Sequence, residues 1–405
     1  MTVVVARRGL RLACLIFAAE VIFSLPFHLP RFFRTTLLAK FGLSNTALGD
    51  IFALYGLMAM LAYFPGGLLA DRYPLRALLA GSLAATAAGG LYLATIPGVN
   101  GLRVLYGYWG ITTILLFWAA LIRATRVWGG ALTQGRAFGL LEGGRGLVAA
   151  VLGSLAMPLL VRGGAAAVAL DLVAVIYFYT AATALAAVLV WICIPATETD
   201  TEADLPAEGS VQGVLTAPVI WWQAVVVIAA YCGYKGLDYY ALFAQQALGL
   251  NEVEAARWFA LSAYLRPVAA IVAGLCADRI GIARLVTALF GFGSVAYVLC
   301  GLPAIYPAFL LSASLLLTLA GVYALRGVYF ALLQESGVTS THTGTAIGLI
   351  SVVGYTPDVF FAPLAGRLLD GAPGSAGFQH VFLLLGGIFA LGAVAAWRLR
   401  ARALG

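Results

Sequence analysis

Ionisable side chains occur in the middle of long apolar segments, where a charge is costly unless it has a use. Counting about 1.5 Å per residue from the segment ends places six of them roughly 10 Å or more inside. They are Glu20, Arg145, Lys235, Arg266, Arg326 and Asp358, with His28 somewhat shallower. Such a group near a bilayer centre costs several kcal/mol unless it faces a cavity or a partner. Each is therefore a candidate for binding a charged ligand or carrying a proton.

Two pairs of ionisable residues have helical spacing. Glu142 and Arg145 are three residues apart, so they share one helix face and can neutralise each other. A purely structural pair and a role in a cavity are both open at this point. Lys235 and Asp238 have the same spacing, but Asp238 lies a turn nearer the outer surface. The sequence therefore predicts that Lys235 is the less fully compensated residue of its pair.

The deep charges also differ in sign. Cations outnumber acids: Arg145, Lys235, Arg266 and Arg326 against Glu20, Glu142 and Asp358. This excess favours an anionic ligand, and the alternative is that each cation is matched by an acid or by carbonyl groups on a neighbouring helix. The carboxylates, together with Asp238, are candidates for proton coupling or ion pairing, because burial favours the neutral form of a carboxyl group. Prolines beside His28 and Asp358 predict broken helices at both sites.

The segments that position these residues are long enough to cross a membrane. Of 405 residues, 62% are hydrophobic and 10% are charged, against roughly 25% charged residues in soluble domains. We predict twelve spans, at about 10–33, 46–70, 75–95, 102–122, 136–160, 166–194, 218–246, 252–276, 284–302, 306–333, 343–369 and 376–398. The first begins behind Arg7 and Arg8 with no small-residue cleavage site, so we expect a span there rather than a signal peptide.

The charged residues outside the spans predict the organisation of the chain. An acidic linker at 197–215 separates two predicted six-helix bundles, 1–196 and 216–405. Lys and Arg residues fall on one side of the predicted spans, which predicts cytoplasmic termini in an inner membrane. Because these cations sit in ones to threes at span ends, they do not indicate nucleic-acid binding. The five cysteines lack metal or disulfide spacing, so we expect no metal and no cofactor.

The two halves repeat each other in sequence. A shift of 207 residues places Gly42-Leu43 on Gly249-Leu250 and Phe52-Ala-Leu54 on Phe259-Ala-Leu261. The same shift places Ala70-Asp-Arg72 on Ala277-Asp-Arg279. Parallel repeats of this kind are typical of transporters whose six-span halves are related by a pseudo-two-fold axis. We therefore expect an all-α membrane fold of two pseudo-symmetric six-helix bundles.

The segment Gly67-Leu-Leu-Ala-Asp71-Arg72-Tyr-Pro-Leu-Arg76 and its echo Gly274-Leu-Cys-Ala-Asp278-Arg279-Ile-Gly-Ile-Ala-Arg284 resemble the loop signature of the major facilitator superfamily. The resemblance implies twelve transmembrane helices and a conformational latch formed by Gly67, Asp71, Arg72, Arg76, Gly274, Asp278, Arg279 and Arg284. Glycine would allow close approach of two helices there. The alternative is that these are solvated loop charges that serve only topology.

Other stretches, from Trp128 to Gly146 and from Tyr355 to Asp358, resemble a bacterial branch near the nitrate and organophosphate exchangers. In those exchangers one cation on each of spans 1 and 7 contacts the anion, and the 207-residue shift aligns His28 with Lys235 and Arg31 with Asp238. The resemblance therefore implies solute contacts by Lys235 and by His28 or Arg31. Depth in the predicted spans alone adds three further candidates for solute binding, Arg145, Arg266 and Arg326.

These observations predict a secondary transporter of a small, anionic solute, such as an organic acid, organophosphate, sulfonate or nitrate, by proton symport or exchange. We expect no required protein partner. The alternatives are a sensor that has kept a transporter fold and a lipid flippase. No nucleophile elbow, ATP-binding loop or metalloprotease motif occurs in the sequence, so no enzyme is expected.

Overall fold

The protein is described here from a computed structural model. The structure describes residues 2–129, 134–162, 169–195, 217–302, 308–329, 331–332, 343–372 and 374–403. The predicted linker at 197–215 lies outside these residues. Contacts divide the chain into a first unit, Met1–Thr201 with Leu250–Tyr264, and a second unit, Glu202–Gly249 with Leu265–Gly405. The predicted bundle boundaries at 196 and 216 stay a prediction.

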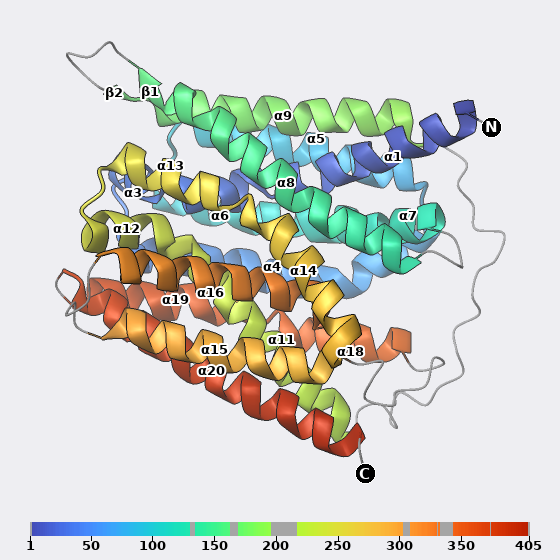
Figure 1. Cartoon of the computed structure of the whole chain (residues 1–405). Helices are drawn as coiled ribbons and strands as arrows, with labels where there is room; N and C mark the ends of the chain where they lie inside the picture. The colour runs from blue at the N-terminus through green and yellow to red at the C-terminus, as the bar shows by residue number, and fades with distance from the viewer. Residues whose placement is uncertain are drawn as a thin grey trace. The chain divides into compact units, whose positions relative to one another are not determined.

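The first unit contains the helices of the N-terminal half (Figure 1). They are α1 (Thr2–Val21), the π-helical turn η1 (Ser24–His28), α2 (Leu29–Phe32), α3 (Arg34–Phe41), α4 (Asn45–Arg72), α5 (Leu75–Ala94), α6 (Val99–Ile111), the π-helical turn η2 (Thr112–Trp118), α7 (Ala119–Gly129), α8 (Gln134–Leu160) and α9 (Leu172–Cys193). A short hairpin of β1 (Val161–Arg162) and β2 (Ala169–Leu170) precedes α9, so the predicted start of span 6 at 166 was too early.

The second unit contains most helices of the C-terminal half. They are α11 (Pro218–Gly236), the 3₁₀ turn η3 (Leu237–Tyr239), α12 (Tyr240–Leu248), α14 (Leu265–Ile280), α15 (Ile282–Gly301), α16 (Ala308–Val328), α18 (Thr343–Gly354), α19 (Pro357–Asp370) and α20 (Ala376–Ala403). The remaining helix of this half, α13 (Glu252–Ser262), is grouped by its contacts with the first unit.

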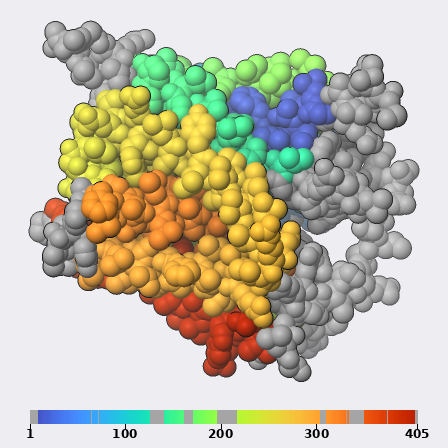
Figure 2. Space-filling model, in the orientation of Figure 1, coloured from blue at the N-terminus to red at the C-terminus, as the bar shows by residue number. Residues whose placement is uncertain are grey.

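Helix α13 packs against α8 within the first unit, and Figure 2 shows its yellow atoms beside the teal atoms of α8. The rings of Phe32 and Phe259 lie 5.4 Å apart, and the Thr36 hydroxyl donates to the Glu252 carboxylate. The chain then turns at Ala263 and Tyr264 before α14 begins. Predicted span 8 is therefore a broken helix, whereas its repeat partner α4 is continuous over the aligned residues.

The internal repeat is visible in the helix ends. Gly42 and Gly249, which the 207-residue shift aligns, have φ angles of 62° and 69°, and each ends a helix. Glycine adopts this left-handed conformation without the steric cost of a Cβ. The next helix in each half begins at an aligned N-cap, Ser44 or Asn251, whose side chain accepts from the backbone N–H three residues later. The repeated residues therefore encode the same turn twice.

The two units also pack their helices in the same order. Helix pairs α1 with α8, α1 with α9, α4 with α6, and α5 with α9 in the first unit correspond to α11 with α18, α11 with α20, α14 with α16, and α15 with α20 in the second. Figure 1 shows α5 beside α9 and α15 beside α20. The fold is therefore the expected all-α arrangement of two pseudo-symmetric bundles.

Most of the predicted spans are long and apolar enough to cross a bilayer. Among the described residues, ten helical segments pass this test, and Gly9–Val21 with Ser24–Phe32 adds an eleventh span bent by 41°. The remaining predicted span, 218–246, corresponds to α11, η3 and α12 and is interrupted after Gly236. This composition and helix order agree with a protein of twelve transmembrane helices.

Close packing of α6 on α4 gives a first prediction, which concerns stability. A Cβ at Gly110 would lie 2.5 Å from the backbone oxygen of Tyr55, so one of the two helices would have to shift. We expect Gly110→Ala to lower the free energy of unfolding by about 1–3 kcal/mol, as overpacking does. Thermal unfolding in detergent measures this loss. The control is Gly107→Ala in the same helix, where a Cβ meets its nearest atom at 3.7 Å; equal losses would contradict the prediction.

Candidate functional site

The structure brings eight of the candidate residues into two clusters, each inside one unit. The first-unit cluster is Glu20, His28, Glu142 and Arg145, and the second-unit cluster is Lys235, Asp238, Arg326 and Asp358 with the tyrosines around them. Each cluster joins the first and fifth spans of its half, which pack against each other as α1 with α8 and α11 with α18. The charges are thus held by helix packing rather than by loops.

The broken first span places His28 beside Glu20. Helix α1 ends at Val21, and the chain continues through the π-helical turn Ser24–His28, which contains Pro26. Proline has no backbone N–H and disturbs regular α-helical bonding, which accounts for a break here. His28 Nε2 then lies 3.3 Å from Glu20 Oε1, and His28 Nδ1 lies 3.3 Å from Ser24 Oγ. The predicted break of span 1 is confirmed.

Arg145 reaches this pair from α8. Its Nε donates to Glu20 Oε2 at 2.8 Å, and its Nη1 donates to Glu142 Oε1 at 2.5 Å. The Phe23 and Trp118 rings lie 5.8 Å and 5.9 Å from the guanidinium carbon. The expected contact between Glu142 and Arg145 is confirmed, and Glu20 is a second acid that the spacing did not indicate. The Glu142 side chain is 34% exposed and that of Glu20 only 1%.

In the second unit, Lys235 lies near the end of α11 and pairs with an acid on another helix. Its Nζ is 3.0 Å from Asp358 Oδ1 and 4.0 Å from Asp238 Oδ2. Lys235, which the sequence predicts to be the less fully compensated residue of its pair with Asp238, thus gains a second carboxylate from span 11. The Lys235 side chain is 3% exposed and that of Asp358 is 12% exposed.

Asp358 is positioned by the expected break in span 11. Helix α18 ends at Gly354 and α19 begins at Pro357, so Asp358 lies in the first turn of α19. A carboxylate is stabilised at a helix N-terminus by the unpaired N–H groups and the helix dipole. The Tyr231 hydroxyl also lies 3.1 Å and 3.0 Å from the two Asp358 oxygens. The carboxylate therefore receives a cation, a hydroxyl and a helix end together.

Tyrosine rings surround the same pair. The Tyr231 ring stacks on Tyr234 at 5.9 Å and meets Tyr355 edge-on at 4.8 Å. The Arg326 guanidinium of α16 lies 4.1 Å from the Tyr234 ring centre and 5.8 Å from that of Tyr231. Both positions are within the range of cation–π attraction. A cluster of two cations, two acids and three partly exposed tyrosines can bind an anionic group beside an aromatic surface when the anion replaces one of the carboxylates.

Two further candidate cations are also buried. Arg31 on α2 is 5% exposed and Arg266 on α14 is 6% exposed. Arg266 lies 6.0 Å from the Tyr323 ring. Arg34, which the sequence did not single out, is 1% exposed and donates from Nε to Asn45 Oδ1 at 3.0 Å.

The signature loops are exposed, as a latch or a solvated loop would be. Arg72, Asp278, Arg279 and Arg284 are exposed, and Arg76 is partly buried under the Trp191 ring at 4.4 Å. The Asp71 side chain lies outside the described part of the structure. Arg123, not a latch candidate from the sequence, donates from Nη1 to the Ala70 carbonyl at 2.5 Å. This bond ties α7 to the last turn of α4.

The packing reason given for the signature glycines was wrong in this structure. A Cβ at Gly67 or Gly274 would meet no atom within 4 Å. The close approach falls one residue earlier, at Gly66, where a Cβ would lie 2.8 Å from the Leu115 carbonyl oxygen. Helix α4 turns its Gly66 face, rather than its Gly67 face, toward η2.

Ser24 and Tyr231 are contact residues that the sequence reasoning missed. Each lies one helical turn before a candidate, His28 or Lys235, and the 207-residue shift aligns Ser24 with Tyr231. A search for polar residues at aligned positions on the same helix face as the candidates would have found both. The repeat thus places a hydroxyl next to the titratable group in each half.

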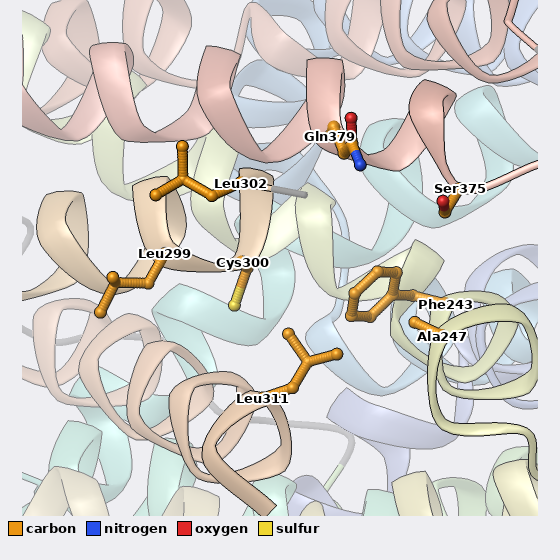
Figure 3. Close-up of a pocket in the computed structure, with 8 residues that line it drawn as sticks. All are labelled: Phe243, Ala247, Leu299, Cys300, Leu302, Leu311, Ser375 and Gln379. Carbon is orange, nitrogen blue, oxygen red and sulfur yellow. The ribbon is translucent and has the colours of Figure 1, made fainter. Parts of the chain in front are cut away.

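The second unit also contains a small cavity of about 40 Å³. None of the residues that line it is charged. Figure 3 shows Phe243, Leu299, Cys300 and Leu311 around it, with Ser375 and Gln379 at its polar side. This volume has room for a few water molecules at most. The cavity is therefore too small for an organic solute.

The fold, the apolar helices and the charge pairs between spans define a polytopic helical membrane protein built from two repeated halves. The sequence model of the Major Facilitator Superfamily matches residues 16–359. The chain therefore belongs to the Major Facilitator Superfamily, a family of membrane transporters, as the loop signature indicated.

Relatives and solved structures agree with this assignment. The chain is 27% identical over 400 residues to "Inner membrane protein YqcE" of Escherichia coli (strain K12), covering 96% of this chain and 93% of that protein. It is 28% identical over 353 residues to "Inner membrane protein YihN" of the same strain, covering 84% and 83%. These relatives support an integral inner-membrane protein.

The solved structures share the fold. A mutant of the nucleoside transporter NupG matches with a TM-score of 0.73 at 12% identity, covering 97% of this chain and 99% of that one. A bacterial homologue of the human lysosomal transporter Spinster, inward-facing and unoccupied, matches with a TM-score of 0.76 at 13% identity, covering 98% of both chains. Sequence identities this low establish a shared fold but not a shared substrate.

Proposed function

We propose that the protein is a secondary transporter that moves a small anionic solute by alternating access, either with a proton or in exchange for another anion. The observation that carries the proposal is the pair of Lys235 and Asp358 beside partly exposed tyrosines, with Arg326 on the same aromatic surface. A solute anion can take the place of the Asp358 carboxylate at Lys235, because both are negatively charged oxygen acceptors.

Protonation of Asp358 links this replacement to a proton. A neutral carboxyl group no longer compensates Lys235, so the buried ammonium gains from binding an external anion. The Tyr231 hydroxyl, which contacts both carboxylate oxygens, stays in place to bond either form. Binding of one proton and one monovalent anion then leaves the charge of the cluster unchanged. This arithmetic supports symport, while direct displacement of Asp358 by the anion supports exchange.

The buried cations of both clusters have acidic partners. Arg145 is matched by two acids, and Lys235 is matched by Asp358 with Asp238 farther away, so a count of buried cations no longer favours an anion by itself. The proposal rests instead on the position of Tyr231 between two cations. The Arg326 guanidinium lies over the Tyr231 ring, and the Tyr231 hydroxyl bonds Asp358, which is the partner of Lys235. The lipid flippase and sensor alternatives have no comparable feature in the described residues.

We also propose the orientation predicted from the loops, with both termini in the cytoplasm. The cations Arg72, Arg279 and Arg284 are exposed at the ends of spans, where the excess of Lys and Arg marks the cytoplasmic side. The exposed latch residues of both signature loops then face the cytoplasm, where we propose that they hold one conformation of the transport cycle.

The second prediction tests the solute class by thermal unfolding of the detergent-purified protein. Phosphate esters, carboxylates, sulfonates and nitrate are compared with neutral sugars, a nucleoside and cationic drugs. An anion at about 100 times its dissociation constant should add roughly 2.7 kcal/mol of stability. The shift should vanish in Arg326→Ala and persist in Lys40→Ala, which removes the chain's other lysine, an exposed one.

Counterflow in proteoliposomes then distinguishes a carrier from a sensor. The anion that stabilises the protein should exchange across the membrane in the presence of unlabelled anion on the other side. Stabilisation only by nucleosides, sugars or cations would overturn the anionic assignment. Binding without counterflow would favour the sensor.

A further inference from the structure

Aromatic side chains face one another beside the Lys235–Asp358 pair. The Tyr231 and Tyr234 rings are nearly parallel, at an interplanar angle of 26° and a centroid distance of 5.9 Å, and Tyr355 meets Tyr231 edge-on at 4.8 Å. Aromatic rings prefer these offset and edge-on arrangements because each ring has a negative face and a positive edge. All three side chains are partly exposed. The cluster therefore presents ring surface, as well as charge, to a solute.

Arg326 lies over two of these rings. Its guanidinium carbon is 4.1 Å from the centre of the Tyr234 ring and 5.8 Å from that of Tyr231. A guanidinium is planar and weakly hydrated, so it stacks on aromatic faces more readily than an ammonium does. It attracts an aromatic ring whose centre lies within about 6 Å. A solute ring placed on this surface would therefore contact both tyrosine rings and a cation.

Contacts among the helices hold this surface in place. Gln223 is 0% exposed and lies about two helical turns before Tyr231 on α11, and its Nε2 donates to the Tyr329 carbonyl at 2.5 Å. Tyr329 follows Arg326 by three residues, just beyond the end of α16, and its hydroxyl lies 3.5 Å from that of Tyr355. A side-chain donor at a helix end bonds a carbonyl that the helix itself leaves unsatisfied. The last turn of α16 is thus held before a solute binds, which lowers the ordering cost of binding.

The proposed anion site lies at one end of the same surface. An anion that takes the place of the Asp358 carboxylate at Lys235 meets the Tyr231 hydroxyl, which lies 3.1 Å and 3.0 Å from the two carboxylate oxygens. The hydroxyl and the ring belong to one side chain, so the atoms next to the anionic group can extend along the Tyr231 ring. Arg326 lies over that ring. A solute bound in this way has its charge at Lys235 and its body beside the tyrosine rings and the guanidinium.

We propose that the solute is an organic anion that carries an aromatic ring next to its charged group, such as an aromatic carboxylate. The inference rests on the proposed transport function and specifies the chemical class of its solute. An inorganic anion such as nitrate leaves the tyrosine surface unused, and a polyhydroxylated acid offers this surface no aromatic face. An aromatic ring uses the faces of the tyrosines and the charge of Arg326 together.

Phenylacetate and cyclohexylacetate test this class, because they have the same charge and nearly the same size and differ in the ring. Thermal unfolding of the detergent-purified protein over a series of concentrations measures the apparent dissociation constant of each. We expect phenylacetate to bind about tenfold more tightly, which lies within the combined range of one ring–ring and one cation–π contact. Cyclohexylacetate is the more apolar acid, so non-specific uptake into the micelle would favour it instead. Equal binding, or tighter binding of cyclohexylacetate, would overturn the proposal.

Variants of Tyr234 locate the preference in this surface. Tyr234→Phe keeps the ring and should keep the preference for phenylacetate, whereas Tyr234→Leu keeps an apolar side chain and should abolish it. Tyr177→Leu, which replaces a tyrosine of α9 that is 52% exposed, is the control and should bind both acids as the wild-type protein does. A preference that is unchanged in Tyr234→Leu would overturn the assignment of the ring to this surface. The comparison of the two acids on the wild-type protein decides on the class even if Tyr234→Leu does not fold.

A wider set of solutes separates this inference from the proposed function. Stabilisation by cyclohexylacetate, gluconate or nitrate, but not by aromatic anions, would overturn the aromatic class and leave the anion carrier intact. Absence of stabilisation and of counterflow for every anion, aromatic ones included, would refute the proposed function itself. Phenylacetamide, which has the same ring and no charge, should give a smaller shift than phenylacetate at equal concentration. Equal shifts would refute the anionic part of the proposal.

Discussion

Lys235→Ala is expected to abolish transport and to lower the free energy of unfolding by about 3–5 kcal/mol, the cost of removing one partner of a buried ion pair. Asp358 would keep the Tyr231 hydroxyl and its helix end but lose the ammonium at 3.0 Å. Thermal unfolding and proteoliposome uptake measure the two effects. Lys40→Ala, which removes the exposed lysine, should change neither.

A double variant separates stability from transport. In Lys235→Ala/Asp358→Ala both charges are gone, so most of the lost stability should return, because no buried charge is left uncompensated. Transport should not return, because the proposed anion site has lost its lysine. A double variant that transports at the wild-type rate would show that the pair only holds α11 against α19. Lys235→Arg, which keeps a charge with a larger donor group, should retain solute binding better than alanine.

Features encoded in local sequence could be predicted well. The aligned glycines Gly42 and Gly249 end helices in the same left-handed conformation, so the repeat was readable from the residues themselves. The break before Asp358 follows from Pro357, and the contact of Glu142 with Arg145 follows from helical spacing. In each case the deciding interaction spans only a few residues.

Contacts between spans could not be predicted, because an apolar helix gives little indication of which face meets which neighbour. Glu20 and Arg145 are 125 residues apart, and nothing in either span marks the other as its partner. The same holds for Lys235 and Asp358 on α11 and α19. The expected excess of deep cations came from counting ionisable residues without their partners. Ion pairs between spans compensate Arg145 and Lys235, so the count of cations overstates the uncompensated positive charge.

The two ion pairs also reveal an asymmetry within the symmetric fold. In the first unit the first span supplies the acid, Glu20, and the fifth span supplies the cation, Arg145. In the second unit the first span supplies the cation, Lys235, and the fifth span supplies the acid, Asp358. Equivalent helices thus carry opposite charges in the two halves.

Arg145→Met is the second change with a large expected effect. It leaves Glu20, 1% exposed, without its guanidinium partner, and should cost about 3–5 kcal/mol of stability at neutral pH. Because the native state of the variant favours a protonated Glu20, that state binds more protons than the unfolded chain, so stability falls as the pH rises. The loss should therefore shrink on acidification, as thermal unfolding across a pH series would measure.

Two further variants locate the cause of that pH dependence. Glu20→Gln/Arg145→Met carries no buried carboxylate at position 20, so its stability should recover and its extra pH dependence should disappear. Glu142→Gln should cost less than Glu20→Gln, because the Glu142 side chain is 34% exposed and that of Glu20 only 1%. A loss in Arg145→Met that is equal at all pH values would mean that Arg145 acts through packing on Phe23 and Trp118. A loss that reverses in acid means that the cluster is held together by charge.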